Sequence, residues 1–424
     1  MKSKKLKKWT TLLTCATALT VMTACSQSNS QVTGTTTSSK TSAVTATTSK
    51  KTNKNNSNYF TSKDSDTSYD ESSASKIKLS GSSADVSGDG VMVSDSTVTI
   101  SKAGTYVISG KSDGVQIKVD AGDSDDVHIV LDGATMTNTN AAINATKAGH
   151  VYLTLKDGTT STLSDSSSNS DEDADAVIFS KGDLTINGSG TLNIDAKKNN
   201  GIKANDSLHM NGGTYKITSV GDAFNVNDEL NITGTTMTIE AEEDGVKVDN
   251  DDDTSVGTMY LSDNTMTIKA GDDGIHASGD LIIDSGTYKL EKSTEGIEGK
   301  SVTINGGNID VYATDDGINA ANSNASQSEI FFKMTGGTLN VEVGEGDTDP
   351  IDSNGDIIVS GGTINLTGQS GFDFDGSATY TGGDITINGE KQTKIENSMP
   401  GGGGPQGDGG PQGGGQPGGF SGGH

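Results

Sequence analysis

The sequence predicts an all-β solenoid whose short strands stack in parallel, and two observations carry this prediction. The first is a motif of an acidic residue, a small residue and an apolar residue, which begins at Asp222, Asp244, Asp273, Glu295 and Asp316. Its steps are 22, 29, 22 and 21 residues, and such a period is typical of repeats that pack only on their neighbours. The second is composition: 30% of the 424 residues are hydrophobic and 57 are Gly, which suits the narrow core of a β-solenoid.

Residues 1–25 have the pattern of an export signal. Five lysines precede an apolar run from Leu12 to Ala24, which is too short to span a membrane permanently. The run ends in Val-Met-Thr-Ala-Cys25, which resembles a bacterial lipobox. We therefore expect a lipoprotein signal peptide with lipidation at Cys25, and a location at the outer face of the cell membrane. Plain cleavage of the signal is the alternative.

Two segments are predicted to be disordered because they lack residues that form a core. Residues 26–76 are mainly Ser, Thr, Asn and Lys, and are expected to form a tether. Residues 396–424 are rich in Gly, Pro and Gln, and are expected to form a tail.

Residues 77–395 carry the predicted solenoid, with about 22 residues per coil. Within it, segments such as 182–194, 279–290 and 355–366 alternate apolar and polar residues around Asn-Gly-type turns. Each coil is therefore expected to run strand, turn, strand, acidic turn, strand. The apolar residue of the repeated motif is predicted to point inward, in one column of Phe224, Val246, Ile275, Ile297 and Ile318.

The formal charge of −27 excludes nucleic acid as a partner and favours divalent cations. The five acids of the repeat are predicted to lie about 4.8 Å apart along one line, where neighbouring carboxylates repel by roughly 3 kcal/mol per pair. Glu243, Asp272 and Asp315 add a second acid before three of them, and Asp249 lies in an adjacent insertion. Carboxylate oxygens from adjacent turns suit Ca²⁺. The alternative is that these are ordinary Asp-Gly turns with solvated acids.

The Gly-Asp-Leu/Ile strands, the Asn-Gly-Gly-Thr turns and the Asp-Asp-Gly-Ile turns resemble a family of bacterial carbohydrate-binding proteins. That family is built as right-handed parallel β-helices of pectate-lyase-like topology. The resemblance implies a calcium-stabilised, surface-attached binder of plant-type or acidic polysaccharide. It also implies that calcium ligands fall on Asp244, Asp272, Asp273, Asp315 and Asp316, with Glu295 and Asp222 as further candidates.

An enzyme on the same framework, either a polysaccharide lyase or a glycoside hydrolase, is the main alternative. The chain contains no arginine, since all 30 basic residues are lysines, and this excludes a lyase that uses an arginine base. A lysine base at Lys247, Lys269 or Lys300 stays open, because burial can lower the pKa of an amine. No catalytic residue is assigned.

A binding protein that does not cleave its ligand is the favoured interpretation, and a structural or adhesive spacer is the third. The expected partner is an acidic or cellulosic polysaccharide, bound by a monomer. Sugar binding usually uses aromatic platforms with polar groups that orient the ring, and the exported body lacks Trp because Trp9 lies in the signal. The candidate carbohydrate contacts are Tyr260, Tyr288, Tyr312 and Lys247.

Overall fold

The computed structural model describes residues 56–250, 253, 255–346 and 348–398. The chain divides into two units, Met1–Lys51 and Thr52–His424, and the described residues all belong to the second. The expected signal peptide with Cys25, residues 26–55 of the expected tether and residues 399–424 of the expected tail lie outside the described residues.

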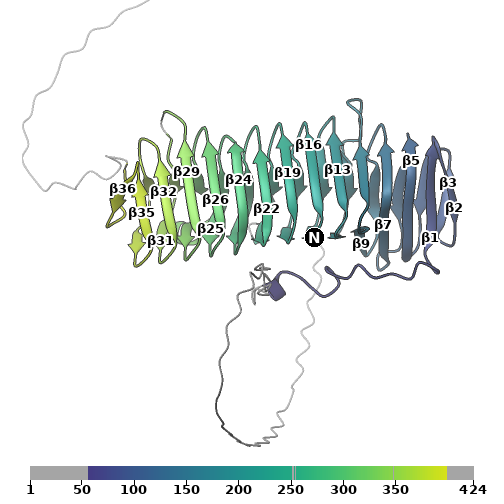
Figure 1. Ribbon diagram of the computed structural model, residues 1–424, viewed down its shortest axis with the longest axis horizontal. Coiled ribbons are helices and arrows are strands. Elements are labelled where there is room, and N and C mark those ends of the chain that lie inside the picture. The colour runs from purple at the N-terminus through teal and green to yellow at the C-terminus, as the bar shows by residue number, and fades with distance from the viewer. Residues whose placement is uncertain (1–55, 251–252, 254, 347, 399–424) are drawn as a thin grey trace, which may run out of the picture. The chain divides into compact units, whose positions relative to one another are not determined.

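The described residues confirm the all-β prediction. They form 36 strands in one hydrogen-bonded sheet, together with two short 3₁₀ helices, η1 (Asn56–Asn58) and η2 (Gln327–Glu329). Strands of successive coils lie side by side in chain order (Figure 1). Within the described part of the chain, no helix has the length and apolar character needed to cross a membrane.

The strands form three parallel stacks, which the chain visits in turn. The first stack contains β1 (Ser75–Gly81), β5 (Gly104–Asp113), β7 (Asp126–Thr137), β9 (His150–Leu155), β12 (Leu184–Gly188), β15 (Ser207–Asn211), β18 (Glu229–Thr233), β21 (Thr258–Ser262), β23 (Ile275–Ile283), β25 (Ile297–Ile304), β28 (Phe331–Met334), β31 (Asp356–Val359) and β34 (Ala378–Tyr380). The second contains β10 (Thr160–Ser164), β13 (Thr191–Ala196), β16 (Thr214–Ser219), β19 (Thr236–Ala241), β22 (Asn264–Lys269), β24 (Gly286–Lys292), β26 (Asn308–Ala313), β29 (Thr338–Val343), β32 (Thr363–Thr367) and β35 (Asp384–Ile387). The third contains β4 (Thr97–Ile100), β6 (Gln116–Asp120), β8 (Ile143–Lys147), β11 (Ala176–Ser180), β14 (Asn200–Ala204), β17 (Phe224–Val226), β20 (Val246–Val248), β27 (Ile318–Ala320), β30 (Ile351–Ser353) and β33 (Phe372–Phe374), and it also includes the first residues of β23 and β25.

Antiparallel pairs occur only near the two ends of this described strand array. β2 (Ser83–Ser87) pairs with β1, and β3 (Val91–Ser94) pairs with β4. β36 (Glu390–Gln392) pairs with β35 at the other end. A terminal hairpin occupies hydrogen-bonding groups that an exposed strand edge would otherwise offer to another chain.

Alternating side chains of the three stacks meet in one continuous apolar core. In β13, for example, Leu192 and Ile194 are buried while the residues between and beside them are more exposed. Phe224, Val246, Ile275, Ile297 and Ile318 stand in register, and each is fully buried. The inward column predicted from the repeat is therefore confirmed.

The turn between the first and second stacks requires glycine in several successive coils. Gly307, Gly337 and Gly362 have φ values of 99°, 84° and 88°, in the left-handed region that glycine adopts readily. A Cβ on Gly337 would also lie 2.7 Å from the carbonyl oxygen of Gly307 in the neighbouring coil. The Gly-Gly pair of these turns thus satisfies both the backbone angle and the close approach of adjacent coils.

The segment 57–74, which we call the strap, differs from the disordered tether expected over residues 26–76. It lies against strands of the first stack and leads into β1 (purple in Figure 1). Asp64 in its middle is only 2% exposed, and its Oδ1 accepts a hydrogen bond from the Thr185 hydroxyl of β12 at 2.8 Å. Specific side-chain hydrogen bonds and a few ring contacts, rather than a continuous apolar sequence, order this segment.

Candidate functional site

An acidic residue recurs in six successive turns that enter the third stack, two residues before the inward apolar residue. The first three of these acids are buried and the last three are half-buried. Since those apolar residues are in register, the acids form one column, which we call the acidic ladder: Asp222, Asp244, Asp273, Glu295, Asp316 and Asp349. The repeat predicted the first five. Asp349 was missed because its motif is Asp-Pro-Ile rather than Asp-Gly-Ile.

One carboxylate oxygen of three of the six ladder acids fixes the turn of the next coil. The backbone N–H of Asp244 donates to Oδ1 of Asp222 at 3.0 Å, and that of Asp273 donates to Oδ1 of Asp244 at 2.8 Å. The N–H of Asp349 donates to Oδ1 of Asp316 at 2.8 Å. These bonds give the ladder a structural role that does not depend on a metal ion.

The second carboxylate oxygen faces an outer column of residues, each three positions after a ladder acid: Asn225, Lys247, His276, Glu298, Asn319 and Asp352. The Asn225 amide donates to Asp222 at 2.6 Å, and the Lys247 ammonium donates to Asp244 at 2.8 Å. The Asn319 amide donates to Glu295 at 2.9 Å. Nitrogen donors thus occupy the positions at which cations were expected in these coils.

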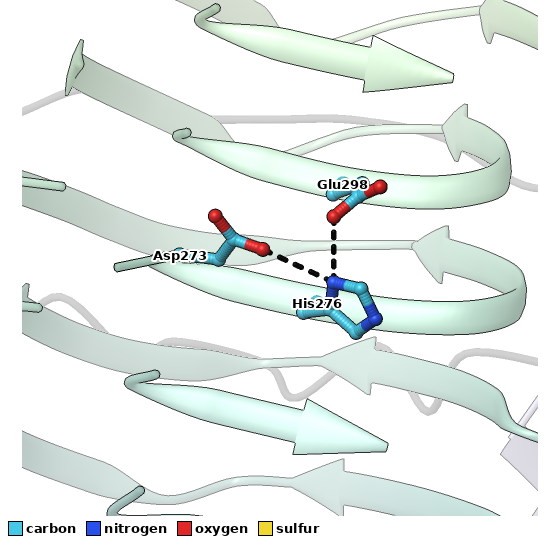
Figure 2. A group of neighbouring side chains, drawn as sticks. All are labelled: Asp273, His276 and Glu298. Atoms are coloured by element: carbon cyan, nitrogen blue, oxygen red, sulfur yellow. Dashed lines mark hydrogen bonds and ion pairs between the residues drawn. The ribbon is translucent and has the colours of Figure 1, made fainter. Parts of the chain in front are cut away.

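His276 lies between two carboxylates from adjacent coils (Figure 2). Its Nδ1 is 2.6 Å from Glu298 Oε2 and 3.1 Å from Asp273 Oδ2. Burial opposes the charged imidazole, but the two acids raise the pKa of His276 to about 10. Burial raises the pKa of Asp273 to about 6, with Asp244 adding to the effect. The protonated imidazole acts as the local cation for this pair of acids.

Beyond Glu298 the outer column carries no positive charge, and the pKa values of the acids rise. Burial raises the pKa of Glu295 to about 8, and Glu298 and Asp273 add to the rise. Burial, then Asp316, Asp373 and Asp349, raise the pKa of Asp352 to about 7. Burial and three neighbouring acids likewise raise the pKa of Asp316 to about 6. Negative potential therefore accumulates at the C-terminal half of the ladder.

The remaining predicted metal ligands divide into those that the structure brings together and those that it separates. Carboxylate oxygens of Asp244, Asp272 and Asp273 lie within 4.8 Å of one another. Glu243 and Asp315 are exposed beside the ladder, and Asp249 is half-buried at the end of β20. Among the described residues, these last three join no group of three potential metal ligands within that distance.

Two of the three tyrosines proposed as sugar platforms are not exposed. Tyr288 is fully buried because it points inward, in register with Met266 and Ile309. Tyr260 points outward, but Tyr59 of the strap stacks on it with ring centroids 3.7 Å apart, which leaves it 1% exposed. Of the candidate carbohydrate contacts, Tyr260 and Tyr288 are therefore closed to a ligand in this structure.

Tyr312 lies in an open groove of about 690 Å³ on the outward side of the second stack, and its side chain is 39% exposed. The groove is also lined by charged and amide side chains, namely Lys269, Lys289, Glu291, Asp310, Asn340, Glu342 and Asn365. The Asn340 amide donates to Asp310 at 2.6 Å, and the Asn365 amide donates to Asn340 at 2.7 Å. An aromatic ring beside ordered polar groups is an arrangement that sugar binding usually uses.

The three lysines considered as possible bases are all ion-paired. Lys247 bonds Asp244, Lys269 lies 3.4 Å from Glu291, and Lys300 lies 3.1 Å from Asp280. Burial would lower the pKa of Lys247, but Asp244 and other acids raise it above its usual value. A protonated amine is the opposite of what proton abstraction needs.

A family profile for carbohydrate-binding domain-containing proteins matches residues 94–348 and 273–399. A relative from Acetivibrio thermocellus, also described as a carbohydrate-binding domain-containing protein, is 38% identical over 135 residues. That alignment covers 30% of this chain and 47% of the relative, so the chain spans about half of the relative's length.

A solved structure described as the polysaccharide lyase-like protein from C. thermocellum, in a gadolinium derivative, is 26% identical. The match covers 74% of this chain and 95% of that one, with a TM-score of 0.35, which is too low to equate the two folds. The family profile, in contrast, accounts for most of the strand array described above. The chain belongs to the carbohydrate-binding domain-containing protein family.

Proposed function

We propose that this chain is an exported surface protein, anchored through lipid on Cys25, which binds a polysaccharide as a monomer without cleaving it. Its architecture in this proposal is a right-handed parallel β-helix, which the parallel pairing of three stacks supports. Family membership supports the carbohydrate-binding role. The observation that carries the proposal is the groove at Tyr312, which combines an exposed ring with lysine, carboxylate and amide groups.

The ligand in this proposal is a plant-type polysaccharide, either acidic or cellulosic. Lys269 and Lys289 supply positive charge at the groove, although both lie close to Glu291. Because the chain carries a net charge of −27, a polyanionic ligand needs these lysines or a bound cation to offset the repulsion.

Replacing Tyr312 by alanine is expected to weaken binding of oligogalacturonate or cello-oligosaccharide by about tenfold, as truncation of an aromatic anchor does in binding sites. Isothermal titration calorimetry with both sugars measures the effect. Met92→Ala is the control, because Met92 is a 63% exposed side chain on β3. Equal affinities for wild type and Tyr312→Ala would remove the groove from the proposal.

An assay for unsaturated or reducing-end products with polygalacturonate tests cleavage, and no product is expected.

Calcium is proposed to bind at Asp244, Asp272 and Asp273, whose oxygens already converge within 4.8 Å. The donor set fits the ion because Ca²⁺ prefers carboxylate oxygens in irregular geometry. Asp272 is exposed and free to reorient, whereas Lys247 bonds one oxygen of Asp244 and the backbone N–H of Asp273 donates to the other. The pKa of Glu243, raised by burial and then by Asp222 and Asp244, reports the negative potential at this turn. A bound ion here would stabilise two successive coils.

Asp272→Asn is expected to weaken calcium binding by about tenfold, because it removes one charged ligand while keeping the size of the side chain. Calorimetric titration with calcium chloride measures this. Asp195→Asn removes an exposed acid from β13, outside the ladder, and is expected to bind calcium as wild type does. If both variants bind calcium equally well, Asp272 is not a ligand.

A further inference from the structure

The strap covers a row of outward side chains on six successive strands of the first stack. We call this row the covered face: His128, Tyr152, Thr185, His209, Asn231 and Tyr260. It is distinct from the Tyr312 groove, which lies on the second stack. Two of the chain's five histidines belong to this row, and the groups that contact it come from strap residues 59–69.

One end of the covered face is an aromatic platform that the strap occupies. The ring of Tyr59 stacks flat on Tyr260, with an interplanar angle of 9°. Phe60 approaches His209 edge-on at 5.7 Å, and the Asn231 amide donates to the carbonyl oxygen of Tyr59 at 3.0 Å. A flat ring over an aromatic side chain, with an amide at its edge, is also how a pyranose ring would lie here.

The middle of the covered face is a carboxylate site that the strap also occupies. Oδ1 of Asp64 accepts a hydrogen bond from Thr185 at 2.8 Å and lies 3.3 Å from His209 Nδ1. On its other side, His209 Nε2 is 3.1 Å from Glu229. Burial opposes protonation, but these two acids raise the pKa of His209 to about 9. The covered face therefore presents a cationic imidazole to a single buried carboxylate.

The strap is attached in a way that permits release. The backbone N–H groups of Asp64 and Asp66 donate to Thr61 and Lys63, so these bonds close turns within the strap. In the described part of the chain, no backbone–backbone hydrogen bond joins residues 57–74 to a strand. The Asn187 amide instead donates to the carbonyl oxygens of Asp64 and Asp66. Outward side chains of the first stack, in the covered face and beside it, thus make the contacts, and an external ligand with equivalent groups could replace those of the covered face.

We propose that the covered face is a second carbohydrate-binding site, specific for a sugar that bears a carboxylate, and that the strap is its displaceable intramolecular occupant. This inference rests on the proposed carbohydrate-binding function. A uronic acid supplies both groups that the strap supplies, because its ring face stacks on Tyr260 and its carboxylate replaces Asp64 at His209 and Thr185. A neutral glucan has no group for His209 and does not displace the strap.

The occupied face lowers apparent affinity, because an external ligand binds only the fraction of molecules in which the strap is released. Asp64→Ala removes the internal carboxylate and leaves His209 and Thr185 available. We expect the full-length variant to bind oligogalacturonate about tenfold more tightly than wild type does. A gain of this size corresponds to a strap that is closed in about nine of ten wild-type molecules. Asp66→Ala is the matched control, because Asp66 is an exposed acid of the same strap whose carboxylate bonds only Ser68.

Hydrogen exchange of residues 57–74, followed by mass spectrometry, reports strap release independently of affinity. Oligogalacturonate is expected to speed exchange of this segment in wild type, and cello-oligosaccharide is not. The affinity gained by Asp64→Ala should disappear when His209→Gln is added. Fast exchange in Asp64→Ala without any gain in affinity would overturn the proposal and leave the strap a purely structural element.

The Tyr312→Ala variant separates failure of this inference from failure of the proposed function. Binding that depends on Tyr312 but is unchanged by Asp64→Ala contradicts the second site alone. If neither wild type nor Asp64→Ala with a released strap binds any sugar, the second site and the proposed function are both contradicted. Binding that survives Tyr312→Ala and increases with Asp64→Ala supports the covered face as the principal site.

Discussion

In the presence of a chelator, the melting temperature of this protein is expected to fall as the pH rises from about 4 to about 8. Glu295, Asp352 and Asp316 have folded-state pKa values of about 8, about 7 and about 6, against about 4 in an unfolded chain. Because these values are raised, the stability that the protonated carboxyls contribute is complete below about pH 4. It is lost as the pH passes through each folded-state pKa.

His276 extends this loss to higher pH. Its folded-state pKa of about 10 lies above the unfolded value of about 6.5, so its contribution is complete below about pH 6.5 and is lost towards pH 10. On the acid side, hydrogen bonds hold the pKa of Asp64 below its usual value despite burial, and that contribution is lost as the pH falls below about 4. The stability of the metal-free protein is therefore expected to peak near pH 4–5.

The effect is expected to be large because the three raised carboxyls act together. One pKa unit corresponds to about 1.4 kcal/mol, and since all three groups are partly exposed, solvent screening reduces the sum to a few kcal/mol. A change of that size lowers the melting temperature by roughly 5–10 °C. Calcium bound at Asp244, Asp272 and Asp273 would offset only the part of the repulsion at Glu295 that comes from Asp273, and would raise the stability of the folded protein by binding to it.

Differential scanning calorimetry across this pH range, with chelator and with calcium, provides the measurement. Asp352→Asn removes one of the mutually repelling acids and should make the chelator profile shallower. Asp195→Asn, which removes an acid outside the ladder, should leave the slope unchanged. A flat profile in chelator would mean that the ladder acids are better solvated than their burial indicates.

The stacked-strand organisation was predictable because parallel in-register pairing converts sequence spacing directly into position. Once Phe224 and Val246 occupy equivalent places, the acids two residues earlier must align as well. The same reasoning extends to Asp349, although proline follows it instead of glycine. A search for Asp-x-Ile would therefore have found the sixth acid of the ladder.

The partners of the ladder acids were less predictable, because the outer column has no fixed residue type. Asn225, Lys247 and His276 occupy the same position in three successive coils, and only the coordinates show that all three nitrogens bond ladder carboxylates. A repeat defined by its acids alone overstates the number of places at which a metal ion is needed.

The side-chain direction of the tyrosines could have been read from strand parity. Side chains two positions apart on a strand point to the same face, so Tyr288 is buried together with Leu290. Tyr312 lies between the buried Val311 and Ala313 and therefore points outward. Tyr260 also points outward by this alternation, so its burial depends entirely on the strap. The strap itself was missed because a segment rich in Ser and Asp is typical of disorder. The aromatic pair Tyr59-Phe60 was the one signal against that interpretation.

The second large effect is expected from Ile275→Asp, which places a carboxylate in the apolar core. Ile275 is fully buried between Val246 and Ile297, its partners in the adjacent coils. A buried carboxylate without a partner must either stay charged in an apolar environment or bind a proton, and point mutations of this kind cost on the order of 4–5 kcal/mol. Ile282→Asp is a matched control on the same strand, β23, because Ile282 points outward and is half-buried.

A repetitive stack makes the form of this loss informative, because each coil is stabilised mainly by its two neighbours. Ile275→Asp should therefore split thermal unfolding into two transitions, as the coils before and after β23 lose their coupling. Ile282→Asp should keep one transition, with a small shift. Calorimetry of both variants distinguishes these outcomes, and a single, equally shifted transition in both would contradict the assignment of Ile275 to the shared core. A lowered but still single transition in Ile275→Asp alone would mean that the coils remain coupled through the other two stacks, so that the sheet unfolds as one cooperative unit.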